Sequence, residues 1–119
     1  MSRFTPEAAR RFAADWAAAW NAHDLDRILA HYAEDFEMRS PMIVQVTGEP
    51  TGCLRGKTAV RAYWAQALAA LPKLRFEVLD VLCGMDSLTV YYQGHRGRVA
   101  EVFEFGADGR VLRAHAHYA

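Results

Sequence analysis

The sequence predicts an α+β fold in which helices cover one face of a curved antiparallel sheet and leave a pocket lined by aromatic side chains. The chain has 119 residues, the length of a single domain. Apolar residues recur at helical spacing between residues 12 and 71, whereas residues 74–118 contain short extended segments separated by glycine turns. Helices followed by strands are typical of α+β proteins rather than of alternating βαβ units. We therefore expect one domain, residues 1–119, with about three helices packed on the sheet.

The amino-acid composition favours a folded protein that binds neither nucleic acid nor membranes. Apolar residues make up 52% of the chain and charged residues 24%, and 14 basic residues balance 14 acidic ones. Nucleic-acid binding needs a basic surface, and this chain has no run of basic residues. No apolar stretch approaches the roughly 20 residues that span a bilayer, and the N-terminus lacks the apolar core of a signal peptide. Cys53 and Cys83 form no CxxC pair, so we expect two free thiols in the reducing cytoplasm.

Two helices are expected at the N-terminus. The first begins after Thr5, a good N-cap that is followed by a proline at the first helical position. Its apolar stripe consists of Phe12, Trp16, Ala19 and Trp20. Residues 21–24 interrupt the pattern, and Asp24 can cap a shorter helix with the stripe Leu25, Ile28, Leu29 and Tyr32. Residues 33–35 are expected to end that helix, and residues 36–40 alternate as a short strand.

The middle of the chain combines an ambiguous segment with a third helix. Residues 42–46 are apolar and can form a strand, and residues 47–52 are rich in turn-forming residues. We therefore interpret residues 42–55 as a hairpin or a lid. Gly56 precedes the third helix, and Pro72 ends it. The buried side of this helix is expected to consist of Val60, Tyr63, Trp64, Ala67, Leu68 and Leu71.

The last third of the chain predicts four strands joined by hairpin turns. Each connection is short and contains glycine, which supplies the positive φ that tight hairpin turns require. Successive strands joined in this way form an antiparallel meander. The expected strands are residues 74–83, 88–93, 98–105 and 110–118.

Glu101 is the unusual residue of the third of these strands. Because side chains alternate between the faces of a strand, Glu101 shares a face with Val99, Phe103 and Phe105. A carboxyl group among apolar side chains must find hydrogen-bond partners, or its pKa rises through desolvation. A protonated carboxyl group there can act as a general acid or donate a hydrogen bond to a developing oxyanion. The alternative is structural: Glu101 pairs with an arginine or a tyrosine, or reaches solvent at the rim of the sheet.

The histidines of the last strand form an HxH pair. His115 and His117 share one face of a strand and can chelate a metal ion, but no third ligand stands at a companion spacing. The other face is more apolar, so we expect both histidines to point away from the core and to hold no metal. That face consists of Leu112, Ala114, Ala116 and Tyr118.

Aromatic side chains are concentrated on the helix faces that must pack inward. Such a stripe is more often core than binding site. The indole NH and phenol OH groups nevertheless need partners when they are buried, and a partly open pocket satisfies that need better than a dry core. The residues concerned are Trp16, Trp20, Tyr32, Tyr63 and Trp64.

Nearly the whole chain resembles the nuclear transport factor 2-like superfamily, especially its steroid Δ-isomerase and SnoaL-like polyketide cyclase branches. The motifs that carry the resemblance are W-A-A-A-W-N-A-H-D-L-D at residues 16–26, Y-A-E-D at residues 32–35, G-K-T-A-V-R at residues 56–61 and G-R-V at residues 109–111. The resemblance implies a cone-shaped fold with helices capping a bent sheet around a deep pocket. It also implies a homodimer formed through the outer face of the sheet.

The resemblance also assigns positions to a catalytic site. The general base of the steroid isomerases falls on Ser40, which cannot shuttle a carbon-bound proton unaided. Their oxyanion-hole tyrosine falls on Trp16, a neighbouring tyrosine falls on Trp64, and their second oxyanion donor falls on Glu101. Isomerisation by that route is therefore not expected. The segment at residues 42–55 is longer than its counterpart, so the mouth of the pocket is expected to differ in shape.

Two main hypotheses follow from these observations. In the first, the chain is an enzyme that acts on a small hydrophobic carbonyl or hydroxyl compound by acid–base chemistry, without metal or cofactor. Glu101 and Ser40 are then the catalytic candidates, and the ligand-binding candidates are Trp16, Trp20, Tyr32, Tyr63, Trp64, Phe103 and Tyr118. In the second, the same pocket binds a hydrophobic metabolite without catalysis. A third, weaker hypothesis is a dimerisation module.

Overall fold

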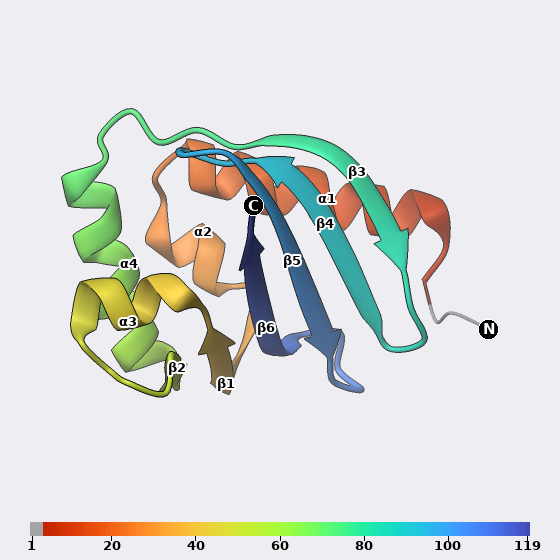
Figure 1. The fold of residues 1–119 in the computed structure, drawn as a ribbon. Helices are drawn as coiled ribbons and strands as arrows, with labels where there is room; N and C mark the ends of the chain where they lie inside the picture. The colour runs from red at the N-terminus through yellow and green to blue at the C-terminus, as the bar shows by residue number, and fades with distance from the viewer. Residues whose placement is uncertain (1–3) are drawn as a thin grey trace.

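Residues 4–119 of a computed structural model describe the protein, and they form four helices packed against a six-stranded sheet (Figure 1). The helices precede most of the strands, so the predicted α+β class is confirmed. In chain order the elements are α1 (Pro6–Asn21), α2 (Leu25–Leu29), β1 (Tyr32–Arg39), α3 (Pro41–Thr47), β2 (Cys53–Arg55), α4 (Lys57–Ala70), β3 (Glu77–Cys83), β4 (Ser87–Gln93), β5 (Arg98–Phe105) and β6 (Val111–Tyr118).

The strands lie in the order β2-β1-β6-β5-β4-β3. Strands β3 to β6 form the predicted antiparallel meander. The expectation of a wholly antiparallel sheet is wrong at one position, because β1 lies parallel to β6, with Tyr32 opposite Val111. Alternation along a strand reveals which residues share a face but carries no information about its direction relative to a distant strand. The short strand β2 extends the sheet antiparallel to β1.

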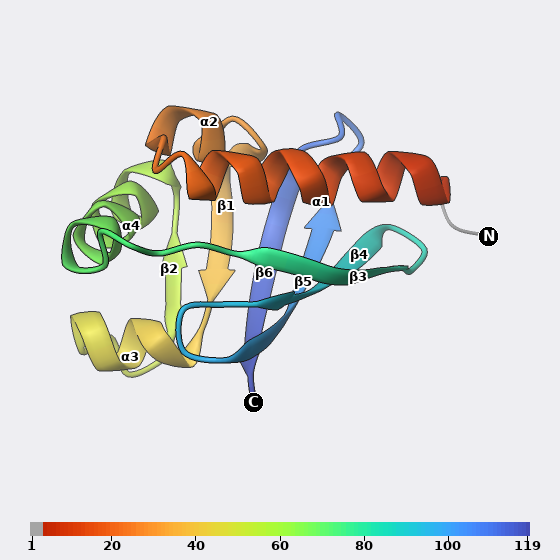
Figure 2. The ribbon, with the colours of Figure 1, turned by 90° about the horizontal axis from the view of Figure 1, so that it is seen from above.

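The helices cover one face of the bent sheet, which we call the inner face (Figures 1 and 2). Helix α1 runs across this face, and α3 and α4 lie toward the end formed by β1 and β2 (Figure 2). On β5 the inner face carries Val99, Glu101, Phe103 and Phe105, all buried, as the alternation predicts. The opposite, outer face has no helix over it in the described residues (Figure 2).

The predicted start of α1 is confirmed, and its end fastens a distant segment. The amide of Ala8 donates to Thr5 Oγ1 at 3.1 Å, which caps the helix. At the other end, Asn21 Nδ2 donates to the carbonyl of Phe76 at 3.0 Å, and the amide of Phe76 donates to Asn21 Oδ1 at 2.7 Å. His23 Nε2 lies 2.9 Å from the carbonyl oxygen of Leu74. These bonds hold residues 74–76 against α1, so β3 begins at Glu77 rather than at residue 74 as predicted.

The second helix is shorter than predicted, because Tyr32 belongs to β1. Helix α2 ends at Leu29, and the amide of Val111 donates to the carbonyl of His31 at 2.9 Å where β6 joins the chain. Tyr32 is fully buried, as the apolar stripe predicts, but it faces the core from a strand and not from a helix. Pairing with β6 provides the backbone hydrogen bonds that a longer helix would otherwise supply.

The prediction of a strand at residues 42–46 is wrong, because this segment is part of α3. Ser40 is its N-cap and accepts a hydrogen bond from the amide of Met42 at 3.1 Å, and Pro41 occupies the first turn. Gly48 ends the helix in the left-handed conformation at φ 79°. The capping residues therefore decide the structure here, although valine and isoleucine favour strands. The turn expected at residues 47–52 is present and leads into β2.

Candidate functional site

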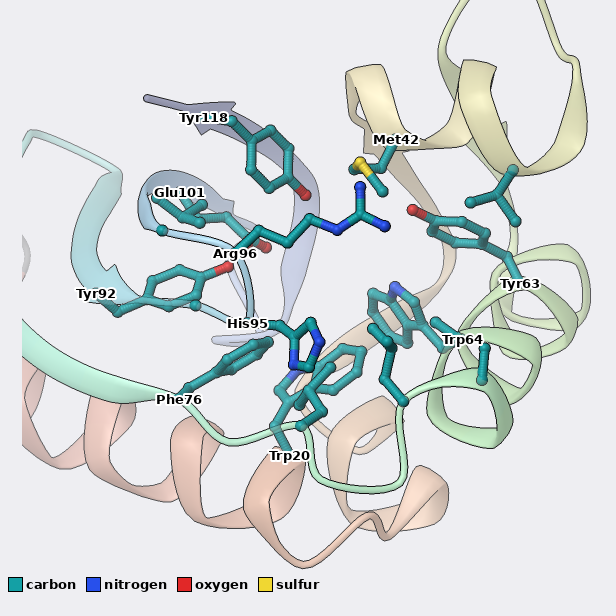
Figure 3. Close-up of a pocket in the computed structure, with 18 of the residues that line it drawn as sticks. Trp20, Met42, Tyr63, Trp64, Phe76, Tyr92, His95, Arg96, Glu101 and Tyr118 are labelled. Carbon is teal, nitrogen blue, oxygen red and sulfur yellow. Dashed lines mark hydrogen bonds between the residues drawn. The ribbon is translucent and has the colours of Figure 1, made fainter.

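A cavity of about 590 Å³ opens between the inner face of the sheet, α1, α4 and the turn between β4 and β5 (Figure 3). This volume is in the range of small-molecule sites, which measure roughly 300–1,000 Å³. Most of its wall is apolar or aromatic. The residues discussed below that line it are Trp16, Trp20, Met42, Tyr63, Trp64, Ala67, Ala70, Leu71, Leu74, Phe76, Tyr92, His95, Arg96, Arg98, Val99, Glu101 and Tyr118.

Glu101 is the only acidic side chain among the residues that line this cavity. Its position in the middle of β5, opposite Val90 and Ala116 on the flanking strands, leaves the residue only 4% exposed. The hydroxyl of Tyr92 donates to Glu101 Oε1 at 2.9 Å. Burial raises the pKa of Glu101 to about 7, and the hydrogen bond from Tyr92 opposes this rise. Protonated and ionised forms of Glu101 therefore coexist near neutral pH.

The tyrosines of the cavity remain neutral hydrogen-bond donors. Burial raises the pKa of Tyr92, Tyr63 and Tyr118 above the ordinary value of a phenol, and the neighbouring Glu101 carboxylate raises each further. Figure 3 shows the hydroxyl ends of Tyr63 and Tyr118 directed toward the interior of the cavity from opposite sides. Neutral hydroxyls placed in this way can donate to an oxygen atom of a ligand.

Ser40 lies behind the cavity wall and not in it. Its hydroxyl donates to Tyr118 Oη at 3.3 Å while accepting from the amide of Met42 at 3.1 Å. Ser40 is 4% exposed and is absent from the residues that line the cavity. The structure therefore places Ser40 as the N-cap of α3 and as a neighbour that orients Tyr118, and not where it would touch a ligand.

The predicted aromatic residues divide between the cavity wall and the core behind it. Trp16 lines the cavity, but its Nε1 donates to Tyr32 Oη at 3.1 Å, so its NH is not free for the oxyanion-hole position that the resemblance assigns to it. Tyr32 and Phe103 are fully buried and do not line the cavity. Trp20 differs, because its buried Nε1 has no hydrogen-bond partner among the described residues.

Most other residues of the cavity wall were not predicted as site residues, among them Tyr92, Phe76, His95 and Arg96. Tyr92 could have been found from the register of the β4–β5 hairpin. In that register Tyr92 lies opposite Val99, and the next pair on the inner face is Val90 and Glu101. Phe76 is carried into the wall by its bonds to Asn21. His95 and Arg96 stand in the β4–β5 turn, whose sequence signals only a turn.

The HxH pair lies on the outer face, as predicted. His115 Nε2 lies 2.6 Å from Glu104 Oε2, and His117 Nδ1 lies 3.2 Å from the carbonyl oxygen of Ala100. Within residues 4–119, no group of three or more histidine, cysteine, aspartate or glutamate side chains is arranged to hold a metal ion.

The comparisons with known proteins identify the family of the chain. The family described as the SnoaL-like domain matches residues 13–114. The chain belongs to this family. Its SnoaL-like fold is similar to the crystal structure of a SnoaL-like protein of unknown function from Burkholderia thailandensis, with 55% sequence identity, a TM-score of 0.94 and coverage of 97% of each chain. The resemblance to the nuclear transport factor 2-like superfamily is thereby confirmed. A comparison with curated proteins gave no match.

No helix within the described part of the chain combines the length and the apolar character needed to cross a membrane.

Proposed function

We propose that the chain is a cofactor-independent acid–base enzyme whose cavity binds a small hydrophobic carbonyl or hydroxyl compound. The observation that carries this proposal is Glu101, a buried carboxyl group in a ligand-sized cavity with a pKa raised to about 7. A catalytic acid or base works best when its pKa lies near the operating pH. Tyr92 is a tyrosine partner of the kind that the structural alternative expects, but its hydroxyl is neutral, so no opposite charge holds the Glu101 carboxyl group in its ionised form.

The arrangement supports proton transfer at the carbon next to a ligand carbonyl. Ionised Glu101 would accept the carbon-bound proton, and the charge would develop on the carbonyl oxygen. The oxygen of Tyr118 accepts a hydrogen bond from the hydroxyl of Ser40. The phenolic hydrogen of Tyr118 is therefore free to donate to the ligand oxygen and stabilise its charge. Protonated Glu101 would then return the proton to the same or another carbon, which regenerates the carboxylate.

Exchange of carbon-bound hydrogen with solvent tests this function without knowledge of the natural substrate. 2-Tetralone is a small apolar ketone, and NMR in D₂O follows the loss of its α-proton signals. We expect the wild-type chain to accelerate exchange and Glu101→Gln to lose about 100-fold or more of that acceleration, as is typical when a general base is removed. Glu104→Gln, which changes a glutamate on the outer face of the same strand, is the matched control and should retain it. Exchange at the buffer rate with wild-type protein would contradict the catalytic proposal.

A non-catalytic binding domain is the second candidate, and Ser40 is the observation that favours it. The position that the resemblance assigns to a catalytic base carries a hydroxyl that already donates to Tyr118 and caps α3. This candidate predicts ligand binding in the cavity together with exchange of 2-tetralone at the buffer rate.

We also propose that two copies of the chain pair through their outer faces. Leu82, Thr89, Val102 and His115 form one row across four strands of that face. Leu82 is 56% exposed, so it leaves apolar area that a second copy could cover. Light scattering at micromolar concentration should give the mass of a dimer, and Val102→Glu should give a monomer, whereas Arg110→Gln in a hairpin turn should not. A monomeric wild-type chain would contradict this proposal.

A further inference from the structure

We propose that the ligand of this cavity is an apolar molecule with a carboxylate group, and that Arg96 binds the carboxylate at the mouth of the cavity. The inference rests on the proposed function, because it names the class of ligand for the same site. Four observations support it, and they concern the position of Arg96, its lack of a partner, the charge balance of the cavity and the supply of hydrogen-bond donors.

Arg96 lies in the β4–β5 turn. It is exposed to solvent and also lines the cavity. Figure 3 shows its side chain extending over the cavity toward the side formed by Tyr63 and Trp64. The turn that carries it is held by the bond from the amide of Gly94 to the carbonyl of Gly97 at 2.7 Å. The guanidinium therefore reaches the cavity from a short turn of defined geometry.

The charge of Arg96 has no partner within residues 4–119. The guanidinium groups of Arg39, Arg55, Arg61 and Arg113 each lie within 4.0 Å of a carboxylate oxygen, whereas Arg96 forms neither an ion pair nor a hydrogen bond there. Its neighbour Arg98 donates to Tyr91 Oη at 3.2 Å. Arg96 is thus the arginine of the cavity that remains available for a ligand.

The side chains of the cavity carry more positive than negative charge, although the whole chain is formally neutral. Arg96 lines it together with one acid, Glu101, which is partly protonated near neutral pH, whereas the guanidinium of Arg98 bonds to Tyr91 on the outer face. The guanidinium of Arg96 is thus a full positive charge without a carboxylate partner within residues 4–119, and its field at the mouth of the cavity favours an anion.

The remaining polar groups of the cavity supply donors. The hydroxyls of Tyr63 and Tyr118 are neutral, and Figure 3 shows them directed into the cavity. Donors directed into a cavity favour a ligand that brings acceptors. A carboxylate is an acceptor-only group whose two oxygens match the fork of a guanidinium. Between these groups the wall is apolar, with Leu71, Leu74 and Phe76, which suits a hydrophobic body.

Displacement of a neutral fluorescent probe tests the inference. N-Phenyl-1-naphthylamine reports occupation of an apolar site, and 2-naphthoate and 2-naphthamide differ only in carrying a carboxylate or an uncharged amide. We expect the naphthoate to displace the probe at about tenfold lower concentration than the naphthamide, as one charge-assisted bond provides. Arg96→Gln should remove this preference, with the affinity of each variant for the probe measured first so that the two competitors are compared within one variant. Arg96→Lys should keep most of it, and Arg110→Gln, at the opposite end of the sheet, should keep all of it.

Two further variants separate failure of this inference from failure of the proposed function. Ala67→Trp and Ala70→Trp place a large ring in the cavity from α4 and should abolish binding of the probe and both competitors, with folding checked by circular dichroism. If these variants abolish binding but naphthoate and naphthamide compete equally, the anion inference is overturned and a neutral-ligand site remains. If the tryptophan variants abolish binding but neither competitor displaces the probe, the anion inference is overturned. If the probe binds equally well to both tryptophan variants, the cavity is not the binding site and the proposed function fails as well.

Discussion

Two glutamates on β5, three residues apart, lie in opposite environments on the two faces of the sheet. Glu101 on the inner face is 4% exposed, and burial raises its pKa to about 7. Glu104 on the outer face bonds to His115 and Arg113, and these bonds lower its pKa. The same residue type on the same strand is thus ionised on one face and near half-protonation on the other.

The two faces of the sheet satisfy polar groups by different means. The outer face pairs charges with each other at partly exposed positions, as in the chain Arg55–Glu37–Arg39 across β1 and β2. The inner face contains few polar groups, and they bond to neutral hydroxyls or, as at Trp20 Nε1, have no partner in the described residues. Groups whose hydrogen-bonding capacity is left open are the ones a ligand can use.

Removal of an inner-face aromatic side chain should lower the free energy of unfolding more than any other change proposed below. Phe103 is fully buried and contacts the rings of Phe12 and Trp16, so Phe103→Ala should lower the free energy of unfolding by about 4 kcal/mol. The adjacent Val102→Ala on the outer face should cost only about 1 kcal/mol, because Val102 is half-buried. Urea unfolding at low protein concentration measures both. Equal losses would show that the outer face is as tightly packed as the inner face.

The second prediction concerns the dependence of stability on pH. The pKa of Glu101 is raised from 4.5 to about 7, so its contribution is fully present below about pH 4.5 and is lost as pH rises through about 7. The free energy of unfolding of Glu101→Gln, measured relative to the wild type, should therefore increase by on the order of 3 kcal/mol between about pH 4 and about pH 9. Urea unfolding of both proteins across this range measures the change.

Glu104→Gln provides the contrast. Because the pKa of Glu104 is lowered, its stabilising contribution is present at neutral pH and is lost as pH falls below the ordinary glutamate range. The side chain is 35% exposed, so the effect should stay below about 1 kcal/mol and have the opposite dependence on pH. A Glu101→Gln variant whose stability follows the wild type at every pH would show that Glu101 titrates as an exposed carboxyl group.

The sequence predicted the inner-face position of Glu101 because strand alternation is a local property. Its period of two holds whatever the neighbouring strands are, so Val99, Glu101 and Phe103 could be placed on one face without further information. The partner Tyr92 required the register of the hairpin as well. The N-cap of α1 was equally local, since Thr5 and Pro6 are sufficient to predict it.

Features that depend on tertiary structure could not be predicted in this way. The apolar run at residues 42–46 is compatible with a strand or a helix, and the capping hydroxyl of Ser40 decides the outcome. The parallel pairing of β1 with β6 joins two segments that lie far apart in the sequence. The direction of Arg96 depends on how the β4–β5 turn lies over the cavity, which the residues of the turn do not encode (Figure 3).

The third prediction is that losing a tyrosine hydroxyl lowers the free energy of unfolding more on the inner face than on the outer face. Tyr32→Phe removes the acceptor of Trp16 Nε1 and leaves a buried NH without a partner, which should cost about 1–3 kcal/mol. Tyr91→Phe is the matched change on the outer face, where the hydroxyl accepts from Arg98 at an exposed position. It should change the free energy of unfolding by less than about 0.5 kcal/mol. Equal effects would contradict the proposed difference between the faces.

The smallest effect is expected at Ser40, where β1 ends and α3 begins. Ser40→Ala removes both the N-cap of α3 and the donor to Tyr118 Oη, and it should cost about 1 kcal/mol. Tyr118→Phe removes only the hydroxyl that Ser40 contacts and should cost less than about 0.5 kcal/mol, since Tyr118 is 47% exposed.

Urea unfolding of both single variants and the double variant separates the two roles of Ser40. If the cap dominates, the double variant should match Ser40→Ala within error, because the bond to Tyr118 is already lost. Ser40→Thr retains a capping hydroxyl and should restore most of the stability. A Tyr118→Phe variant as unstable as Ser40→Ala would instead show that the bond between the two hydroxyls, and not the cap, holds α3 against the sheet. Tyr118 would then be a structural residue of the cavity rather than a free donor to its ligand.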